Sequence, residues 1–120
     1  MKTTLSVEDS AKLIELGVSP ALANVRFDYD KNGNEIREYQ FSLDCLLAIL
    51  PKKITDRRVI YELRMGICNS LGGGEYWYIK YVNPFLDTDE LESFQSAEEL
   101  IDAVYQELCW IKQQENVKES

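Results

Sequence analysis

The stretch VIYELRMGICNSLGGGEYWYIKYV, residues 59–82, carries the clearest strand signals of this 120-residue chain. Apolar and polar residues alternate in residues 59–67 and again in residues 75–82. Alternation with a period of two is typical of strands that bury one face. Glycines lie between the two runs and permit the backbone conformations that a return needs. The stretch therefore predicts an antiparallel hairpin.

Three consecutive glycines, Gly72, Gly73 and Gly74, also invite comparison with a phosphate-binding loop. Such a loop lies between a strand and a helix, so that backbone amides and the helix N-terminus face the phosphate. Here a strand follows the glycines, and the Lys-Ser/Thr end of a Walker motif is absent. We interpret the glycines as part of the hairpin connection.

The two faces of this hairpin are expected to differ. The side chains expected to face the helices are those of Val59, Tyr61, Leu63, Met65, Trp77, Ile79 and Tyr81. Glu62 would lie on the opposite face with the candidate binding residues Arg64, Tyr76, Tyr78 and Lys80. Tyrosines among mixed charges could stack on a base or a sugar, dock a protein, or form cross-strand pairs on a solvated surface.

A second hairpin is predicted in the stretch NVRFDYDKNGNEIREYQF, residues 24–41. Val25, Phe27 and Tyr29 alternate with polar residues, and the alternation resumes beyond Asn32 and Gly33. Asn-Gly between two alternating runs is a strong hairpin signal, because both residues tolerate positive φ.

The same segment resembles the first half of a calcium-binding EF-hand loop, with Asp28, Asp30 and Asn32 at alternate positions before Gly33. The twelfth position of such a loop needs a bidentate glutamate, and Tyr39 stands there instead. An EF-hand loop is also flanked by helices, whereas strands are expected here. We therefore expect a turn and no metal site.

Two short helices are expected in the first half of the chain. Ser6 can cap the first, with Asp9 three residues later as in a capping box, and Gly17 ends it. Ser42 can cap the second, and Pro51 ends it because the residue before a proline avoids the helical region.

A third helix is expected to start at Ser96, with Glu99 completing a capping box, and to bury a stripe of apolar residues. The expected stripe consists of Ala97, Leu100, Ile101, Val104, Leu108 and Ile111. The polar tail from about residue 115 is expected to be frayed.

Trp110 lies about 140° round the third helix from this stripe at 100° per residue, on the same side as Ala103. It could be buried by the connector that carries Phe85 and Phe94, bind a partner, or form the centre of a homodimer in which two copies of the helix meet. Trp110 is therefore added to the candidate binding residues.

The predicted order is α-β-β-α-β-β-α in a single α+β domain, residues 1–120. Four strands in two hairpins favour a four-stranded antiparallel sheet with helices packed on one face.

Composition excludes several classes of function. The net charge is −8, with 21 acidic and 13 basic side chains, so nucleic-acid and membrane partners are not expected. The chain has no histidine, the commonest general base and zinc ligand. Its three cysteines are far apart in the sequence, and no signal peptide or membrane-spanning run is seen. We predict a cytoplasmic protein with no cofactor, no metal and no catalytic residues.

An acidic connector, residues 87–92, supports the one alternative function. Its carboxylates, Asp87, Asp89, Glu90 and Glu92, could bind a hard cation or act as an acid and a base. The alternative is thus a small carboxylate-dependent enzyme or a metal-binding protein.

Three segments carry a resemblance to a group of proteins: FSLDCLLAILPKKI, GGGEYWYIKYVNP and SFQSAEELIDAVYQELCWI. They resemble segments of small acidic proteins of unknown function that accompany bacterial prophages and conjugative elements. The resemblance implies an accessory protein of a mobile element and carries no catalytic residues. Together with the composition, it leads us to expect a non-catalytic protein that acts by protein–protein contact.

Overall fold

The computed structural model describes residues 2–69, 72–90 and 94–119, without the side chains of residues 87–90 and 116–119. Its helices are α1 (Val7–Glu15), the 3-10 helix η1 (Pro20–Leu22), α2 (Leu43–Ile49) and α3 (Leu100–Glu119). Its strands are β1 (Asn24–Tyr29), β2 (Glu35–Gln40), β3 (Lys53–Asp56), β4 (Val59–Asn69), β5 (Glu75–Asn83), β6 (Leu86–Glu90) and β7 (Gln95–Ala97). The predicted α+β class with antiparallel strands is confirmed. The predicted single sheet is wrong, because these strands form two sheets.

The limits of α1 and α2 agree with the sequence. The Ser6 hydroxyl accepts a hydrogen bond from the Asp9 amide at 3.1 Å, and the Ser42 hydroxyl accepts one from the Cys45 amide at 3.2 Å. Both side chains thus satisfy an amide that the first helical turn leaves without a partner. Leu50, which precedes the proline, has an extended conformation with ψ 121° and ends α2.

The larger sheet has the order β3-β4-β5-β6, and β7 also pairs with β5. Its centre is the predicted hairpin of β4 and β5, in which Asn69 lies opposite Glu75 across the glycine-containing connection. The prediction of a hairpin connection is confirmed. Gly73 has φ 91°, a conformation that side chains disfavour.

Three strands of this sheet were not expected. β3 and β4 are joined by a tight turn in which Arg57 and Arg58 have φ 50° and φ 70°. Arginine rarely adopts positive φ, so the sequence carries no turn signal there. β6 overlaps the acidic connector, for which no strand was expected, and β7 includes Ser96, where the third helix was expected to start.

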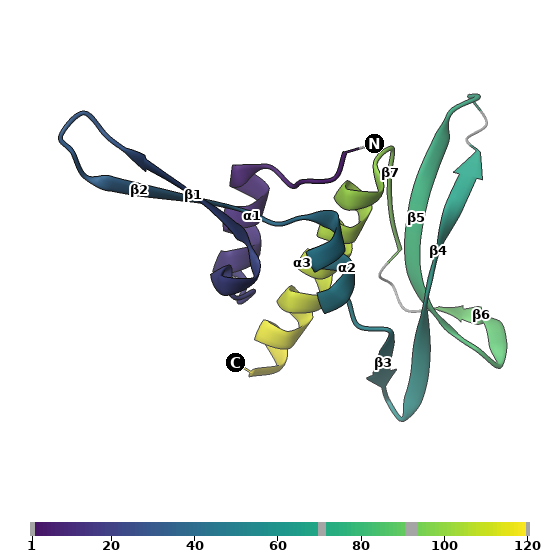
Figure 1. The fold of residues 1–120 in the computed structure, drawn as a ribbon. Helices are drawn as coiled ribbons and strands as arrows, with labels where there is room; N and C mark the ends of the chain where they lie inside the picture. The colour runs from purple at the N-terminus through teal and green to yellow at the C-terminus, as the bar shows by residue number, and fades with distance from the viewer. Residues whose placement is uncertain (1, 70–71, 91–93, 120) are drawn as a thin grey trace.

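We call the hairpin of β1 and β2 the arm. It forms a separate two-stranded sheet that extends away from the helices at one end of the molecule (Figure 1). Its turn differs from the predicted one, because Gly33 has positive φ and Asn32 does not. The base of the arm is anchored where the Phe41 carbonyl accepts a hydrogen bond from the Leu5 amide at 2.9 Å and the Phe41 amide donates to Ser10 Oγ at 3.2 Å.

α3 lies in the middle of the body, between the other helices and the larger sheet (Figure 1). It begins at Leu100, not at Ser96, because residues 95–97 pair with β5 as strand β7. It continues to Glu119, through the tail that was expected to be frayed. Leu100, Ile101, Val104, Leu108 and Ile111 are buried as predicted. No helix in the described part of the chain is long and apolar enough to cross a membrane.

The burial of Ala103 shows that the predicted exposed side of α3 was wrong. Ala103 was expected on the exposed side of the helix, and it is fully buried. The fully buried Glu107 also lies outside the expected stripe. Both follow from the central position of α3, because a helix packed on two sides buries more than one stripe.

Candidate functional site

The face of the larger sheet that points away from the helices is the candidate functional site, and we call it the outer face. α1, α2 and α3 all lie on the other side of β4 and β5 (Figure 1). Tyr61, Ile79 and Tyr81 are buried in the core with the helices, so the residues that alternate with them point outward. The cross-strand pairs of the outer face are Glu62 with Val82, Arg64 with Lys80, Gly66 with Tyr78, and Cys68 with Tyr76.

The structure therefore brings four of the predicted binding residues onto one surface: Arg64, Tyr76, Tyr78 and Lys80. Arg64 is exposed, and the other three are half-buried. Met65 and Ile67, on the helix side of β4, are 38% and 54% exposed. Met65 was expected to pack on the helices, but β4 and β5 extend beyond them (Figure 1).

Tyr78 is the centre of an aromatic platform on the outer face. A Cβ atom placed on Gly66 would lie 2.9–3.1 Å from the Tyr78 ring and hydroxyl, so the ring covers the glycine directly. The Phe94 ring stacks on Tyr78, with centroids 6.2 Å apart and planes 13° apart. The Lys80 ammonium lies 5.8 Å from the centre of the Tyr78 ring. We define the platform as Gly66, Tyr78, Lys80 and Phe94.

Charged side chains border this platform. The Arg64 guanidinium lies 3.2 Å from the Glu62 carboxylate. It also donates a hydrogen bond to the Leu63 carbonyl at 3.2 Å. Exposed ion pairs of this kind contribute little to stability. They do hold Arg64 beside Lys80 on the same face. The site thus combines stacked aromatic rings with an arginine, residue types that are enriched in protein interfaces.

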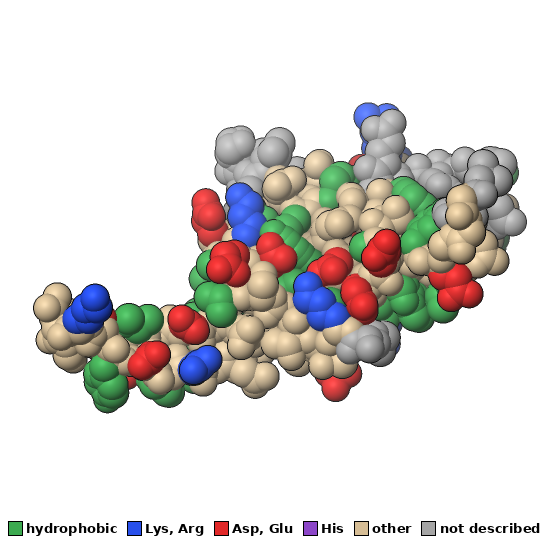
Figure 2. Space-filling model, turned by 90° about the horizontal axis from the view of Figure 1, so that it is seen from above, with side chains coloured by type: hydrophobic (Ala, Val, Ile, Leu, Met, Phe, Trp, Pro, Cys, Tyr) green, Lys and Arg blue, Asp and Glu red, His purple; other side chains and the backbone are tan. Residues whose placement is uncertain are grey.

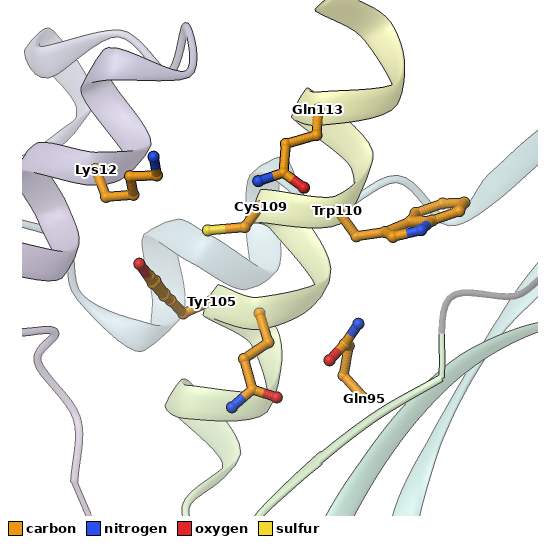
Figure 3. Close-up of a pocket in the computed structure, with 7 residues that line it drawn as sticks. Lys12, Gln95, Tyr105, Cys109, Trp110 and Gln113 are labelled. Carbon is orange, nitrogen blue, oxygen red and sulfur yellow. The ribbon is translucent and has the colours of Figure 1, made fainter. Parts of the chain in front are cut away.

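Trp110 does not belong to this site. It lies on α3, on the helix side of the sheet, where it is half-buried and packs against the core. It is one of the residues that line a cavity of about 360 Å³, together with Lys12 and Cys109. Figure 3 shows that Trp110 and Cys109 point to opposite sides of α3. A homodimer around Trp110 would also lack the small exposed Ala103, which is buried.

The cysteines near this cavity and in α2 lack the features of nucleophiles. Burial raises the pKa of the Cys109 thiol, although its contact with Tyr105 and the charge of Lys12 act in the opposite direction. Burial likewise raises the pKa of Cys45. A reactive cysteine needs a lowered pKa, because the thiolate is the nucleophile.

The acidic connector lies mostly outside the described side chains. The backbone of Asp87, Asp89 and Glu90 forms part of β6, but their side chains, and the whole of Glu92, lie outside the described residues. Among the described residues, no group of three or more histidine, cysteine or acidic side chains could hold a metal ion. The enzyme or metal-binding alternative therefore remains a prediction from sequence.

The aspartate side chains of the arm accept hydrogen bonds from backbone amides in and beside its turn. Asp30 Oδ1 accepts hydrogen bonds from the amides of Asn32 at 2.8 Å and Asn34 at 2.9 Å. Both bonds lower the pKa of Asp30, and the bond from the Asn34 amide has the larger effect. Asp28 Oδ1 accepts a bond from the Tyr29 amide at 2.8 Å.

We accordingly expect calcium to leave the stability of the protein unchanged. A ligand that binds only the folded state raises the free energy of unfolding by RT ln(1 + [L]/Kd), and with it the melting temperature. The aspartates of the arm already accept hydrogen bonds from backbone amides. Thermal unfolding should be measured with Ca²⁺ up to a few millimolar, with Mg²⁺ as the control. A melting temperature that rises with Ca²⁺ alone would show that this interpretation of the loop is wrong.

Two members of the platform were missed in the sequence. Phe94 lies in the acidic segment, where nothing indicated a strand that would bring it beside Tyr78. Gly66 did carry a signal, since a glycine inside a strand often marks the close approach of another group.

No protein-family model, curated protein or solved structure matches this chain.

Proposed function

We propose that this chain is a non-catalytic cytoplasmic binding protein that acts by contact with another protein through its outer face. The observation that carries the proposal is the aromatic platform, in which Tyr78 lies directly on Gly66 and stacks on Phe94. The Tyr78 ring is already held between a glycine and a second ring, so it loses little side-chain conformational entropy when a partner docks on it. Phe94 remains 49% exposed, so part of this aromatic surface is available to a partner.

The composition of the surface favours a protein partner. Tyrosine, phenylalanine and arginine are enriched in the centres of protein interfaces and account for much of their binding energy. The net charge of −8 disfavours nucleic acid, although a base could stack on the same rings. The resemblance to accessory proteins of prophages and conjugative elements suggests that the partner is a protein of the bacterial host or of the element.

The proposal predicts that disrupting the platform weakens partner binding by about 30-fold or more without unfolding the protein. Truncating a side chain at the centre of such an interface costs about 2 kcal/mol or more of binding free energy. The variants are Tyr78→Ala, which removes the central ring, and Gly66→Ala, whose added methyl group must displace that ring. Ile67→Ala is the matched control, since Ile67 is 54% exposed on the opposite face of β4.

The partner should first be captured from an extract of the native host with the wild-type chain and identified by mass spectrometry. Its affinity for each variant is then measured by titration calorimetry. If the captured protein binds the Tyr78 and Gly66 variants as tightly as the Ile67 control, the outer face is not the binding surface. Retention of nucleic acid instead of protein would contradict the expected class of partner.

A further inference from the structure

The outer edge of β1 has the features of a strand-pairing surface. β1 pairs with β2 along one edge only, and all six of its residues are exposed. An isolated hairpin is marginally stable in water, and its edges offer backbone N–H and C=O groups to another chain. Proteins often protect such an edge with charged side chains, especially lysine, with proline or with a bulge. The sequence of β1, NVRFDY, has no lysine or proline, and its pairing with β2 is regular. Its two charged residues, Arg26 and Asp28, have opposite signs.

The turn of the arm determines which backbone groups of β1 point outward. The Asp30 amide donates to the Asn34 carbonyl at 2.9 Å, so these residues form a hydrogen-bonded pair. Hydrogen-bonded and non-hydrogen-bonded pairs alternate along an antiparallel ladder. The residues of β1 whose N–H and C=O groups point away from β2 are therefore Val25, Phe27 and Tyr29. The Tyr29 amide agrees with this direction, because it donates to Asp28 Oδ1 at 2.8 Å. Pairing with a second copy would replace this bond.

We propose that β1 pairs antiparallel with β1 of a second copy of this chain, about a two-fold axis at Phe27. In this register the two Phe27 residues lie opposite each other, Arg26 lies opposite Asp28, and Val25 lies opposite Tyr29. Opposed side chains share a face, so apolar rings meet on one face and two Arg–Asp pairs form on the other. The backbone groups that point outward are the ones that this register needs for hydrogen bonds.

Charge selects this register over its neighbours. Moving the axis to Arg26 places two arginines directly opposite each other, and moving it to Asp28 places two aspartates opposite each other. Like charges in directly opposed positions destabilise a pair of strands. Of these three registers, the one centred on Phe27 alone avoids a like-charge pair.

The edge of β2 is less suited to the same contact. A two-fold axis at Arg37 or Glu38, in the middle of the strand, opposes like charges. Arg37 also makes contacts within the arm, since it lies 3.3 Å from the Glu35 carboxylate and 5.5 Å from the centre of the Phe27 ring.

The dimer adds to the proposed function without depending on it. Paired arms form a four-stranded sheet in which the tip of each arm, at Lys31, reaches Ala23 and the half-exposed Leu22 of the second copy. The arm extends from one end of the molecule, and the larger sheet lies at the other, with the helices between them (Figure 1). Figure 2 shows the arm projecting from the body. Both outer faces stay open, so the dimer would present two binding surfaces.

The test is a charge exchange measured by sedimentation equilibrium from about 1 μM to about 0.5 mM. Arg26→Asp and Asp28→Arg each place like charges opposite each other, so each variant alone should dissociate at least about tenfold more readily than wild type. An equimolar mixture of the two variants restores both opposite-charge pairs and should form a heterodimer of wild-type affinity.

The matched control is Glu38→Arg. Within the arm Glu38 lies opposite Arg26, so this substitution disturbs the same hairpin and leaves the charges of β1 unchanged. It should dimerise like wild type. Circular dichroism of every variant checks that the body is folded.

A second measurement does not depend on charge. Phe27→Cys should form a disulfide-linked dimer under mild oxidation at a rate well above that of wild type, which has cysteines only elsewhere. Directly opposed residues in an antiparallel pair have Cα atoms about 5.5 Å apart, within the range of a disulfide.

Three results would overturn the proposal: a wild type that is monomeric at about 0.5 mM, a dimer that both charge variants leave unchanged, or charge variants that fail to recombine when mixed. The second result would place the dimer on another surface, such as β2 or the helix with Trp110. If the charge variants do not fold, absence of the Phe27→Cys crosslink decides against the contact.

Discussion

Tyr81→Ala should lower the free energy of unfolding by about 4 kcal/mol, the largest effect that we expect from one substitution. Tyr81 is fully buried in the core between β5 and the helices, and its hydroxyl donates a hydrogen bond to the Pro51 carbonyl at 2.6 Å. Emptying a buried aromatic site costs about 3–5 kcal/mol through lost burial and the cavity that remains. The change also leaves the Pro51 carbonyl without this donor. Urea denaturation followed by circular dichroism measures it.

Two control variants separate the causes. Tyr81→Phe keeps the ring and removes the hydroxyl, so we expect a loss of about 1–2 kcal/mol. Tyr29→Ala removes a tyrosine that is 69% exposed on the arm and should change stability by about 0.5 kcal/mol or less. If Tyr81→Ala and Tyr29→Ala lower the free energy of unfolding equally, β5 does not pack against the helices.

Alkaline pH should lower the free energy of unfolding through Tyr81, by at most about 1.4 kcal/mol for each pH unit above pH 10. Burial, and then the negative charge of Glu107, raise the pKa of Tyr81 far above its ordinary value of 10.0. The unfolded chain ionises this tyrosine near pH 10, while the folded protein keeps it neutral. The contribution is therefore fully present below pH 10 and is lost as pH rises from there toward the folded-state pKa.

The measurement is urea denaturation at intervals from pH 8 to pH 12 for wild type, Tyr81→Phe and Tyr29→Phe. Other groups also titrate in this range, so the difference between wild type and Tyr81→Phe isolates the tyrosine. That difference should change by about 1.4 kcal/mol per pH unit above pH 10. Tyr29→Phe should follow wild type. A parallel course for wild type and Tyr81→Phe would mean that Tyr81 ionises as readily in the folded protein as in the unfolded chain.

The sequence was sufficient for elements whose signals are local. Ser6 and Ser42 cap their helices because a side-chain oxygen and an amide three residues away need nothing else. The alternation of β4 and β5 and the glycines between them led to the correct hairpin, and the core residues Tyr61, Ile79 and Tyr81 face the helices as expected. These features depend on residues close together in the chain.

The candidate site was predictable in part for the same reason. Arg64, Tyr76, Tyr78 and Lys80 share one face because the pleat of a regular hairpin assigns alternate residues to opposite faces. Phe94 joined them only when β7 paired with β5, a contact between segments far apart in the chain. The separation of Trp110 from this surface followed from the packing of α3, which lies on the other side of the sheet.

The sequence by itself determined the helix starts at Ser6 and Ser42, the two hairpins and which residues of β4 and β5 face the core, because each follows from short-range hydrogen bonding and side-chain alternation. Only the tertiary structure decided that the arm stands apart from the larger sheet, that Arg57 and Arg58 form a turn at positive φ, and that Ala103 is buried. In these cases pairing and packing between distant segments outweigh local preference. A strained turn or an unexpected helix face costs less than the hydrogen bonds and buried area that the whole sheet and core provide.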